Sequence, residues 1–168
     1  MCRVTERAQG TFVHAGPSER SSRQTSAVAE RPKVISAIAT LFVRSGIEVA
    51  LVSVEVWETE TVVRLAGLPN DPTAEDQRFH DSLDDWARDG RHGPPPEEPG
   101  TRVLDVHVAL GDDLGTSYIL RSAQRGGTGS LFRGDWFFPT EIPSEASHLT
   151  VTASTHDGEV LGSLSLDV

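Results

Sequence analysis

Short runs of apolar, mostly β-branched residues dominate the chain from residue 34 onward. The first run covers 34–43, and the second, 47–57, carries apolar side chains on both of its alternating faces. A central strand that is covered on both sides has this pattern. A third run at 61–65 follows the Glu58-Thr59-Glu60 turn, so the three runs predict an antiparallel meander.

Alternation of apolar and polar positions returns in the second half of the chain. Residues 104–110 place Leu and Val on one face, as a half-buried strand does. Asp157-Gly158 separates two alternating runs, which is a strong hairpin signal. Further strands are expected at 116–121, 131–138, 147–154 and 159–166. About eight strands joined by turns predict an all-β fold, an Ig-like two-sheet antiparallel β-sandwich.

One stretch, 68–101, interrupts the strand pattern. Asp71-Pro72 is typical of a helix start, and Gly90 is a suitable stop. Between them, Phe79, Leu83 and Trp86 fall on one narrow apolar stripe of a helix. Residues 92–100 (HGPPPEEPG) favour an extended, polyproline-like return. We therefore expect one inserted helix and a stiff linker that together carry the chain from one sheet to the other.

The N-terminal stretch has no such periodicity. Residues 18–26 are rich in Ser and Arg and offer too little apolar area to offset the entropy of ordering. We expect a disordered segment over 1–32 and a single sandwich domain over 33–168.

The charge is unevenly distributed. The chain has a net charge of −10, but residues 1–33 are net basic at +3, which leaves −13 for the rest. So acidic a domain repels phosphate backbones, which argues against nucleic-acid binding. No apolar run approaches the ~20 residues that a bilayer-spanning helix needs, and the N-terminus lacks the order of a secretory signal. With Cys2 as the one cysteine, no internal disulfide is possible, and we expect a cytoplasmic protein that does not contact membranes.

Asp112 and Asp113 are the weak candidates for a metal site. Two carboxylates in a turn, with the Thr116 hydroxyl nearby, offer oxygens to a hard cation such as Ca²⁺. A structural role is favoured over the metal, because Asp caps turns through the backbone N–H two residues on. In that interpretation Gly115 supplies a positive φ and closes a hairpin.

No complete catalytic or cofactor-binding motif is recognisable. The histidines lack the paired spacing of a zinc site, and only His107 is expected on a rigid strand. We expect no cofactor and no catalytic residue.

The aromatic residues divide into two groups. Trp57, Trp136, Phe132 and Phe138 are expected to fill the space between the sheets, with an exposed aromatic platform as the alternative. Trp86 lies on the acidic helix, where it either docks the helix onto the sandwich or recognises a partner. Phe79, Leu83 and Trp86 are accordingly the candidates for partner binding.

The order of several motifs resembles that of a known group of proteins. The motifs are "VEVW" (54–57), "DDLGTSY" (112–118), "FFP" (137–139) and "LTVTAS" (149–154). Over residues 33–168 they are similar to those of uncharacterised actinobacterial β-sandwich proteins. The Asp-x-Gly-Thr-x-Tyr hairpin is also similar to those of Ig-like bacterial modules. The resemblance implies a β-sandwich fold and no particular reaction.

Together these patterns predict a non-enzymatic β-sandwich module that interacts with an unidentified protein partner. The alternative is a metal- or small-ligand-binding sensor or enzyme centred on the Asp112-Asp113 turn.

Overall fold

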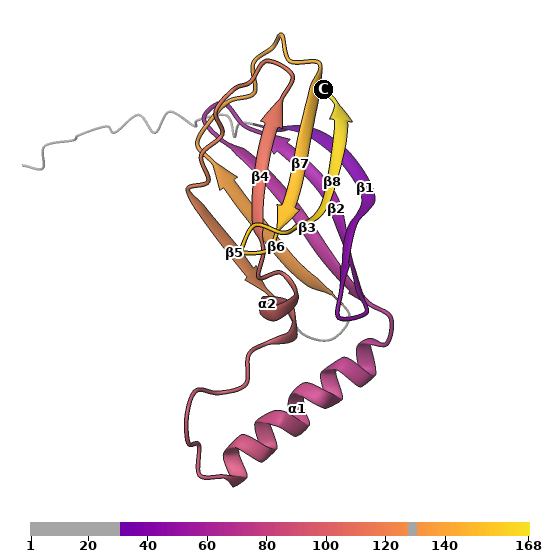
Figure 1. Cartoon of the computed structure of the whole chain (residues 1–168), viewed down its shortest axis with the longest axis vertical. Helices are drawn as coiled ribbons and strands as arrows, with labels where there is room; N and C mark the ends of the chain where they lie inside the picture. Colours follow the sequence, from indigo (N-terminus) through magenta and orange to yellow (C-terminus); the bar gives the residue numbers. More distant parts are fainter. Residues whose placement is uncertain (1–30, 128–130) are drawn as a thin grey trace, which may run out of the picture.

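The computed structural model describes residues 31–127 and 131–168, which form two antiparallel sheets packed face to face (Figure 1). The larger sheet has the strand order β1-β2-β3-β6-β5 and the smaller one β4-β7-β8. The strands are β1 (Lys33–Arg44), β2 (Ile47–Val56), β3 (Thr61–Pro69), β4 (His107–Asp112), β5 (Ser122–Gly126), β6 (Phe132–Phe138), β7 (His148–Ser154) and β8 (Val160–Asp167). The predicted all-β, two-sheet sandwich of eight strands is confirmed.

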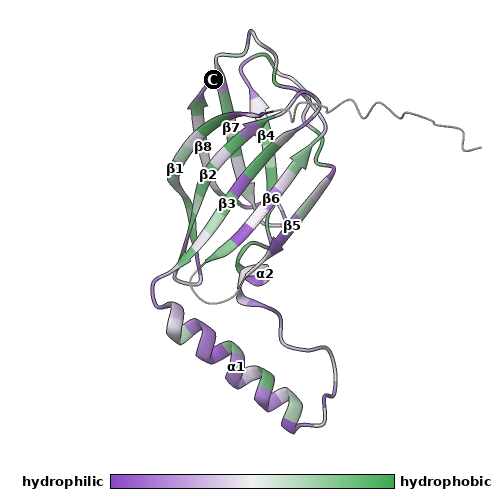
Figure 2. Cartoon of the chain, turned by 180° about the vertical axis from the view of Figure 1, so that it is seen from behind, coloured by the Kyte–Doolittle hydropathy of each residue, from purple (hydrophilic) through white to green (hydrophobic). Residues whose placement is uncertain are grey.

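The predicted meander is present as β1, β2 and β3, and β2 is its central strand. The smaller sheet covers the inward side chains of β2. Three of them, Val49, Leu51 and Val54, are among the most completely buried side chains of the structure. Stretches of hydrophobic residues, coloured green in Figure 2, accordingly run along the strands.

The aromatic residues of β6 form the centre of the core. Phe132, Trp136 and Phe138 alternate along the strand and have side chains that are at most 1% exposed. The Trp136 indole lies over Gly134, where an added Cβ would come within 2.6 Å of the ring. A residue with no side chain at this position makes room for the largest side chain of the core.

The sandwich is closed along the β1–β8 side. A Cβ added to Gly162 of β8 would lie 1.8 Å from the Leu41 carbonyl oxygen of β1. Only glycine allows so close an approach of two backbones. The edge of β1 is thus covered there by the other sheet.

The prediction of a strand over 116–121 is wrong, since β5 begins at Ser122. β4 and β5 belong to different sheets, so the segment between them crosses from one sheet to the other. The expectation that the turn at Asp112 closes a hairpin between neighbouring strands is therefore wrong. Thr116, Tyr118 and Leu120 still alternate as half-buried residues along this crossing, which explains the strand-like pattern in the sequence.

The predicted bounds of the polyproline-like return, 92–100, are also wrong at their C-terminal end. Residues 99–103 form a short helix, α2 (Pro99–Val103), and β4 begins at His107 instead of residue 104. Leu104 and Val106 are buried without belonging to the strand. Pro99 suits the first turn of a helix, and Gly100 lies so close to Gly127 that a Cβ would come within 2.6 Å of its carbonyl oxygen.

Trp57 does not join the core as predicted. It follows the last residue of β2 and is half-buried, outside the cluster of core residues. Its backbone N–H donates to the Glu60 carbonyl, so Trp57 belongs to the β2–β3 turn and not to the strand.

The main helix, α1 (Pro72–Arg88), lies beyond one end of the sandwich and is joined to it by two linkers (Figure 1). It carries the chain from the larger sheet to the smaller one, as the sequence predicts. The expected disorder of 1–32 lies almost entirely outside the described residues. Among the helices described, none is long and apolar enough to cross a membrane.

Candidate functional site

Several connections between strands meet at the end of the sandwich that faces α1. The Gly100 N–H of α2 donates to the Gly127 carbonyl at 3.1 Å, next to the end of β5. Asp105, in the segment from α2 to β4, bonds His156 of the β7–β8 turn at 3.0 Å. The hydrogen bond from His156 is the main cause that lowers the pKa of the Asp105 carboxyl. These bonds hold α2 against the sandwich.

α1 owes its ends to local sequence. The Asp71 Oδ1 accepts from the Ala74 N–H at 3.0 Å, which is the capping bond that the sequence predicts. Pro72 occupies the first turn, where no backbone N–H is needed. Beyond the last turn, Gly90 has φ +76, a conformation that ends helices and that glycine adopts without strain. Local contacts therefore set where the helix begins and ends.

The apolar stripe of α1, formed by Phe79, Leu83 and Trp86, is only half-buried, and no residue of this helix is fully buried. The Trp86 Nε1–H donates to the Gly93 carbonyl at 3.3 Å. The Arg91 guanidinium lies 5.8 Å from the centre of the indole. Trp86 thus packs on the linker that follows its own helix.

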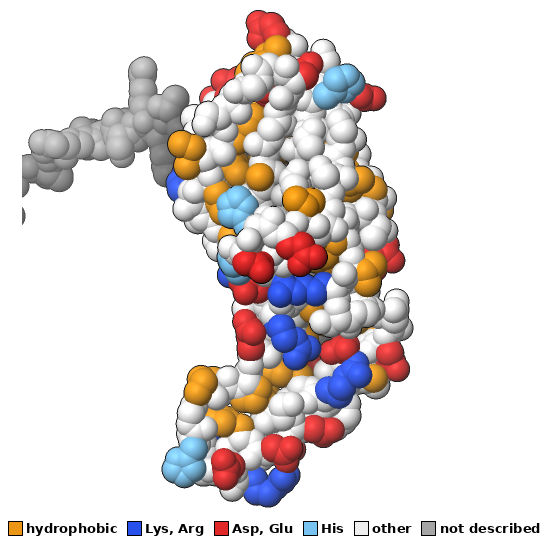
Figure 3. Space-filling model, in the orientation of Figure 1, with side chains coloured by type: hydrophobic (Ala, Val, Ile, Leu, Met, Phe, Trp, Pro, Cys, Tyr) orange, Lys and Arg blue, Asp and Glu red, His pale blue; other side chains and the backbone are white. Residues whose placement is uncertain are grey.

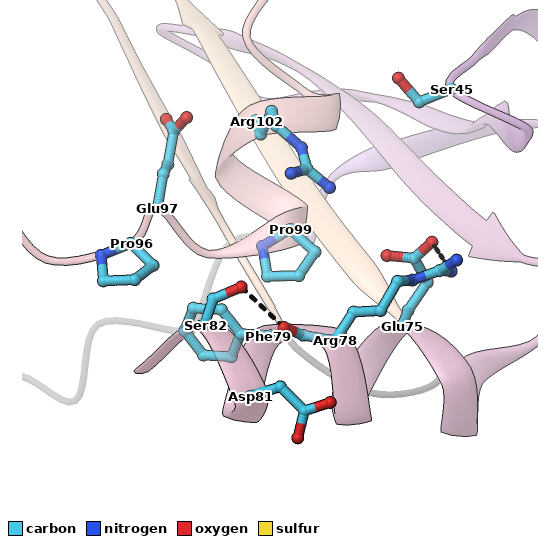
Figure 4. A pocket seen from close by; sticks show the side chains of 10 residues that line it. All are labelled: Ser45, Glu75, Arg78, Phe79, Asp81, Ser82, Pro96, Glu97, Pro99 and Arg102. Atoms are coloured by element: carbon cyan, nitrogen blue, oxygen red, sulfur yellow. Dashed lines mark hydrogen bonds and ion pairs between the residues drawn. The ribbon is translucent and has the colours of Figure 1, made fainter. Parts of the chain in front are cut away.

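A cleft of about 720 Å³ separates α1 from the end of the sandwich. Figure 3 shows this part of the surface, where apolar side chains lie beside Arg, Asp and Glu side chains. Its lining residues come from α1, α2, the linker between them and the β1–β2 turn: Ser45, Glu75, Arg78, Phe79, Asp81, Ser82, Pro96, Glu97, Pro99 and Arg102. Phe79 rises from α1 on the side of Pro99, and Arg102 extends from α2 towards α1, whereas Asp81 points away (Figure 4). Of the three stripe residues, only Phe79 lines the cleft.

The Asp112 carboxylate is fully engaged by its own turn. Its Oδ1 accepts from the N–H groups of Leu114 and Thr116 at 3.0 and 2.8 Å, and its Oδ2 accepts from the Tyr118 hydroxyl at 2.8 Å. Desolvation raises the pKa of Asp112, but hydrogen bonds from Thr116, Tyr118 and Leu114 outweigh it and hold that pKa at about 2. The bond to Leu114 is the turn-capping bond that the sequence interpretation favours.

Asp113 ties the same turn to the smaller sheet. Its Oδ1 accepts from the Ser147 N–H at 3.0 Å and from the His148 N–H at 3.3 Å, just where β7 begins. Desolvation raises the pKa of Asp113, but these backbone hydrogen bonds outweigh it and lower that pKa. Both carboxylates of the pair therefore accept bonds from N–H or O–H donors of the protein itself.

The structure does not bring His107 to the Asp112 turn. The two residues stand at opposite ends of the six-residue strand β4, which spans about 16 Å at ~3.3 Å per residue. His107 is exposed on the outer face of the smaller sheet, opposite Ser154. Within residues 31–127 and 131–168, no three His, Cys, Asp or Glu side chains gather in a metal-binding arrangement.

Sequence reasoning found the stripe of α1 but missed the cleft beside it. Arg102 and Pro99 belong to the short helix α2, which the Pro-rich composition concealed. Ser45 comes from a turn far away in the sequence. The Pro99-Gly100 pair, a helix start followed by a residue suited to close approach, was the one local signal for α2.

No family model, curated protein or solved structure matches the chain. The assignment of function rests on the site itself.

Proposed function

We propose that this chain is a non-enzymatic interaction module that binds a protein partner through the stripe of α1, formed by Phe79, Leu83 and Trp86. The observation that carries the proposal is the position of this helix. It projects from the sandwich with three large apolar side chains that are only partly buried and do not belong to the core. A soluble domain commonly uses the apolar face of a helix to pack on itself or on another protein.

The strand order supports an Ig-like arrangement. β2, β3, β6 and β5 follow one another across one sheet, and β4, β7 and β8 across the other. In a constant-type Ig domain, strands A, B, E and D form one sheet and strands C, F and G the other. Counting β2 as strand A reproduces both orders, and β1 is then an additional edge strand.

In this correspondence α1 occupies the connection between strands B and C. The B–C and F–G connections of variable Ig domains lie at the end that recognises antigen. Here the β7–β8 turn corresponds to F–G, and its His156 bonds Asp105, in the segment that follows the helical insertion. The insertion thus stands at the end of the fold that is suited to recognition.

The alternative function, a metal- or ligand-dependent sensor or enzyme at Asp112 and Asp113, has less support. A bound cation would have to compete with N–H donors and the Tyr118 hydroxyl for the carboxylate oxygens. We keep a cytoplasmic location and a relation to the actinobacterial β-sandwich proteins as parts of the proposal, supported by the single cysteine and by the motif order.

The proposal is tested by capturing proteins from a lysate of the source organism on the immobilised full chain. Leu83→Ser and Trp86→Ala are compared with Ile119→Ser, a control in the β4–β5 connection whose side chain is 71% exposed. We expect a partner that is retained by the wild type and the control and lost by both α1 variants. All four proteins should melt within a few degrees of one another, because no altered side chain belongs to the core.

Equal retention of the partner by the α1 variants would place the binding surface elsewhere and refute the role of the stripe. A thermal shift of several degrees with Ca²⁺, Mg²⁺ or Zn²⁺ that disappears in Asp112→Asn would instead favour the alternative.

A further inference from the structure

We infer that the partner presents an apolar groove with a rim of Lys and Arg side chains. This inference rests on the proposed function, because it concerns the surface that meets the stripe of α1. The inference depends on the charged side chains of the helix, some of which are paired within the protein while others are not.

The insertion is strongly acidic. Residues 71–91 contain seven Asp or Glu and three Arg, a net charge of −4. The three arginines are all engaged locally. Arg78 pairs with Glu75 and Arg88 with Asp85, while Arg91 lies over the Trp86 indole. Little positive charge remains to neutralise the other carboxylates.

Those carboxylates flank the stripe. At 100° per residue, Asp76 and Asp84 fall on one side of the stripe and Asp89 falls on the other. Among the described residues, Asp76 pairs with His80 alone, at 3.6 Å. The side chains of Asp84 and Asp89 have no hydrogen-bonding or ionic partner in the part of the chain that the structure describes. The helix therefore carries uncompensated negative charge on both sides of its apolar stripe.

This charge pattern decides between possible occupants. A second copy would bring another helix of net charge −4 against the first, and like charges across an interface are unfavourable. Phosphate-bearing surfaces, whether nucleic acid or anionic membrane, are repelled in the same way. A protein groove with a basic rim is attracted at long range and also buries the stripe.

The cleft gives such a groove the space to grip the helix. The cleft has a volume of about 720 Å³ and lies between α1 and the sandwich, on the side of the helix that carries Phe79 and Ser82. One wall of a partner's groove can enter there, while the other wall covers the solvent side. The Arg78–Glu75 pair at the edge of the cleft is neutral as a unit. Because Arg102 extends into the cleft from α2, the wall that enters the cleft is expected to be apolar, and the basic rim to lie on the solvent side.

The test uses the full chain and three labelled synthetic peptides of about 18 residues, followed by fluorescence anisotropy. One peptide is an amphipathic Leu/Lys helix, the second replaces Leu by Ser at equal charge, and the third replaces Lys by Glu. We expect the Leu/Lys peptide to bind at least about tenfold more tightly than either of the others at low salt. Leu83→Ser should weaken its binding, and added salt should weaken it as well.

A charge-matched pair of variants isolates the acids of the helix. The triple variant Asp76→Asn, Asp84→Asn, Asp89→Asn should weaken the binding of the Leu/Lys peptide about tenfold. The control Glu141→Gln, Glu145→Gln, Glu159→Gln removes the same charge from exposed residues outside the insertion and should weaken it less than about twofold. Equal losses in the two triple variants, or equal binding of the Leu/Lys and Ser/Lys peptides, would overturn the inference.

The natural partner separates this inference from the proposed function. If the captured partner is lost with Leu83→Ser but kept by the triple Asp variant, the stripe binds it and the basic rim is refuted. If neither change affects its capture, both proposals fail.

Discussion

The apolar side chains of the sandwich and those of α1 differ in how completely the protein buries them. In the sandwich, Trp136 is 1% exposed and lies over Gly134, enclosed by both sheets. On α1, Trp86 is only partly buried, lies outside the core, and contacts the linker that follows its own helix. Both residues lie at regular positions of an amphipathic element. Periodicity therefore shows that an element has an apolar face, but not whether the protein itself covers that face.

This difference separates stability from recognition within one chain. The strands bury side chains that exclude water, which is the main stabilising contribution to a fold. α1 is fixed by its cap and its local ion pairs and contributes no fully buried side chain. The helix can therefore change its surface with little effect on the fold that carries it.

The largest effect is expected from the two tryptophans compared directly. Trp136→Ala should lower the free energy of unfolding by about 3–5 kcal/mol, because it leaves a cavity in the core. Trp86→Ala should lower it by no more than about 1 kcal/mol, since it removes one exposed hydrogen bond and one cation–π contact. Chemical denaturation of the two variants, followed by circular dichroism, measures both.

Comparable losses in the two variants would break the comparison and make α1 part of the cooperative core. Tyr118, which is half-buried at the other end of the sandwich, offers a further reference. The loss in free energy of unfolding for Tyr118→Phe should lie between the losses of the two tryptophan variants or near the smaller of them, because this variant loses a hydrogen bond and keeps the aromatic ring.

A smaller effect, dependent on pH, is expected at the Asp112 turn. The pKa of Asp112 in the folded protein is about 2, below its ordinary value of 3.8, so the ionised carboxylate stabilises the fold. That stabilisation is complete above the ordinary value and is lost as the pH falls through about 2. Asp112→Asn should therefore cost about 1–2 kcal/mol at pH 7 and close to nothing at pH 2.

Urea unfolding at several pH values between 7 and 2 follows this convergence. The control is Asp84→Asn on α1, which should stay within about 0.5 kcal/mol of the wild type throughout. A constant gap between wild type and Asp112→Asn down to pH 2 would contradict the bonding described for this turn.

Much of the sandwich could be predicted because its signals are local. The alternation in β6 and β7 and the Asp157-Gly158 turn each specify a strand or a hairpin from neighbouring residues. The errors occur where distant contacts decide. Residues 116–121 alternate like a strand but cross between the sheets, and residues 99–103 coil into α2 against Gly127.

The candidate site was predictable only in part for the same reason. Asp71 and the spacing of Phe79, Leu83 and Trp86 predict a helix with one apolar stripe. Whether that stripe would meet the sandwich depended on the length and path of the linkers at both ends of α1. The cleft forms because residues of the β1–β2 turn and of α2 lie close to the helix. Local sequence patterns do not predict contacts between residues so far apart in the chain.

The smallest effect on global stability, and the sharpest test of the separation, is expected from the cap of α1. Asp71→Ala removes the bond to the Ala74 N–H and should destabilise the helix itself by about 1 kcal/mol. The melting temperature of the sandwich should move by less than about two degrees, since local opening of α1 does not require the sheets to part. Hydrogen exchange followed by NMR should show faster exchange of the α1 amides and unchanged exchange in β2 and β6. If the strands lose protection in parallel with the helix, α1 and the sandwich unfold as one unit, and the stripe of α1 is held by the fold more firmly than its exposure indicates.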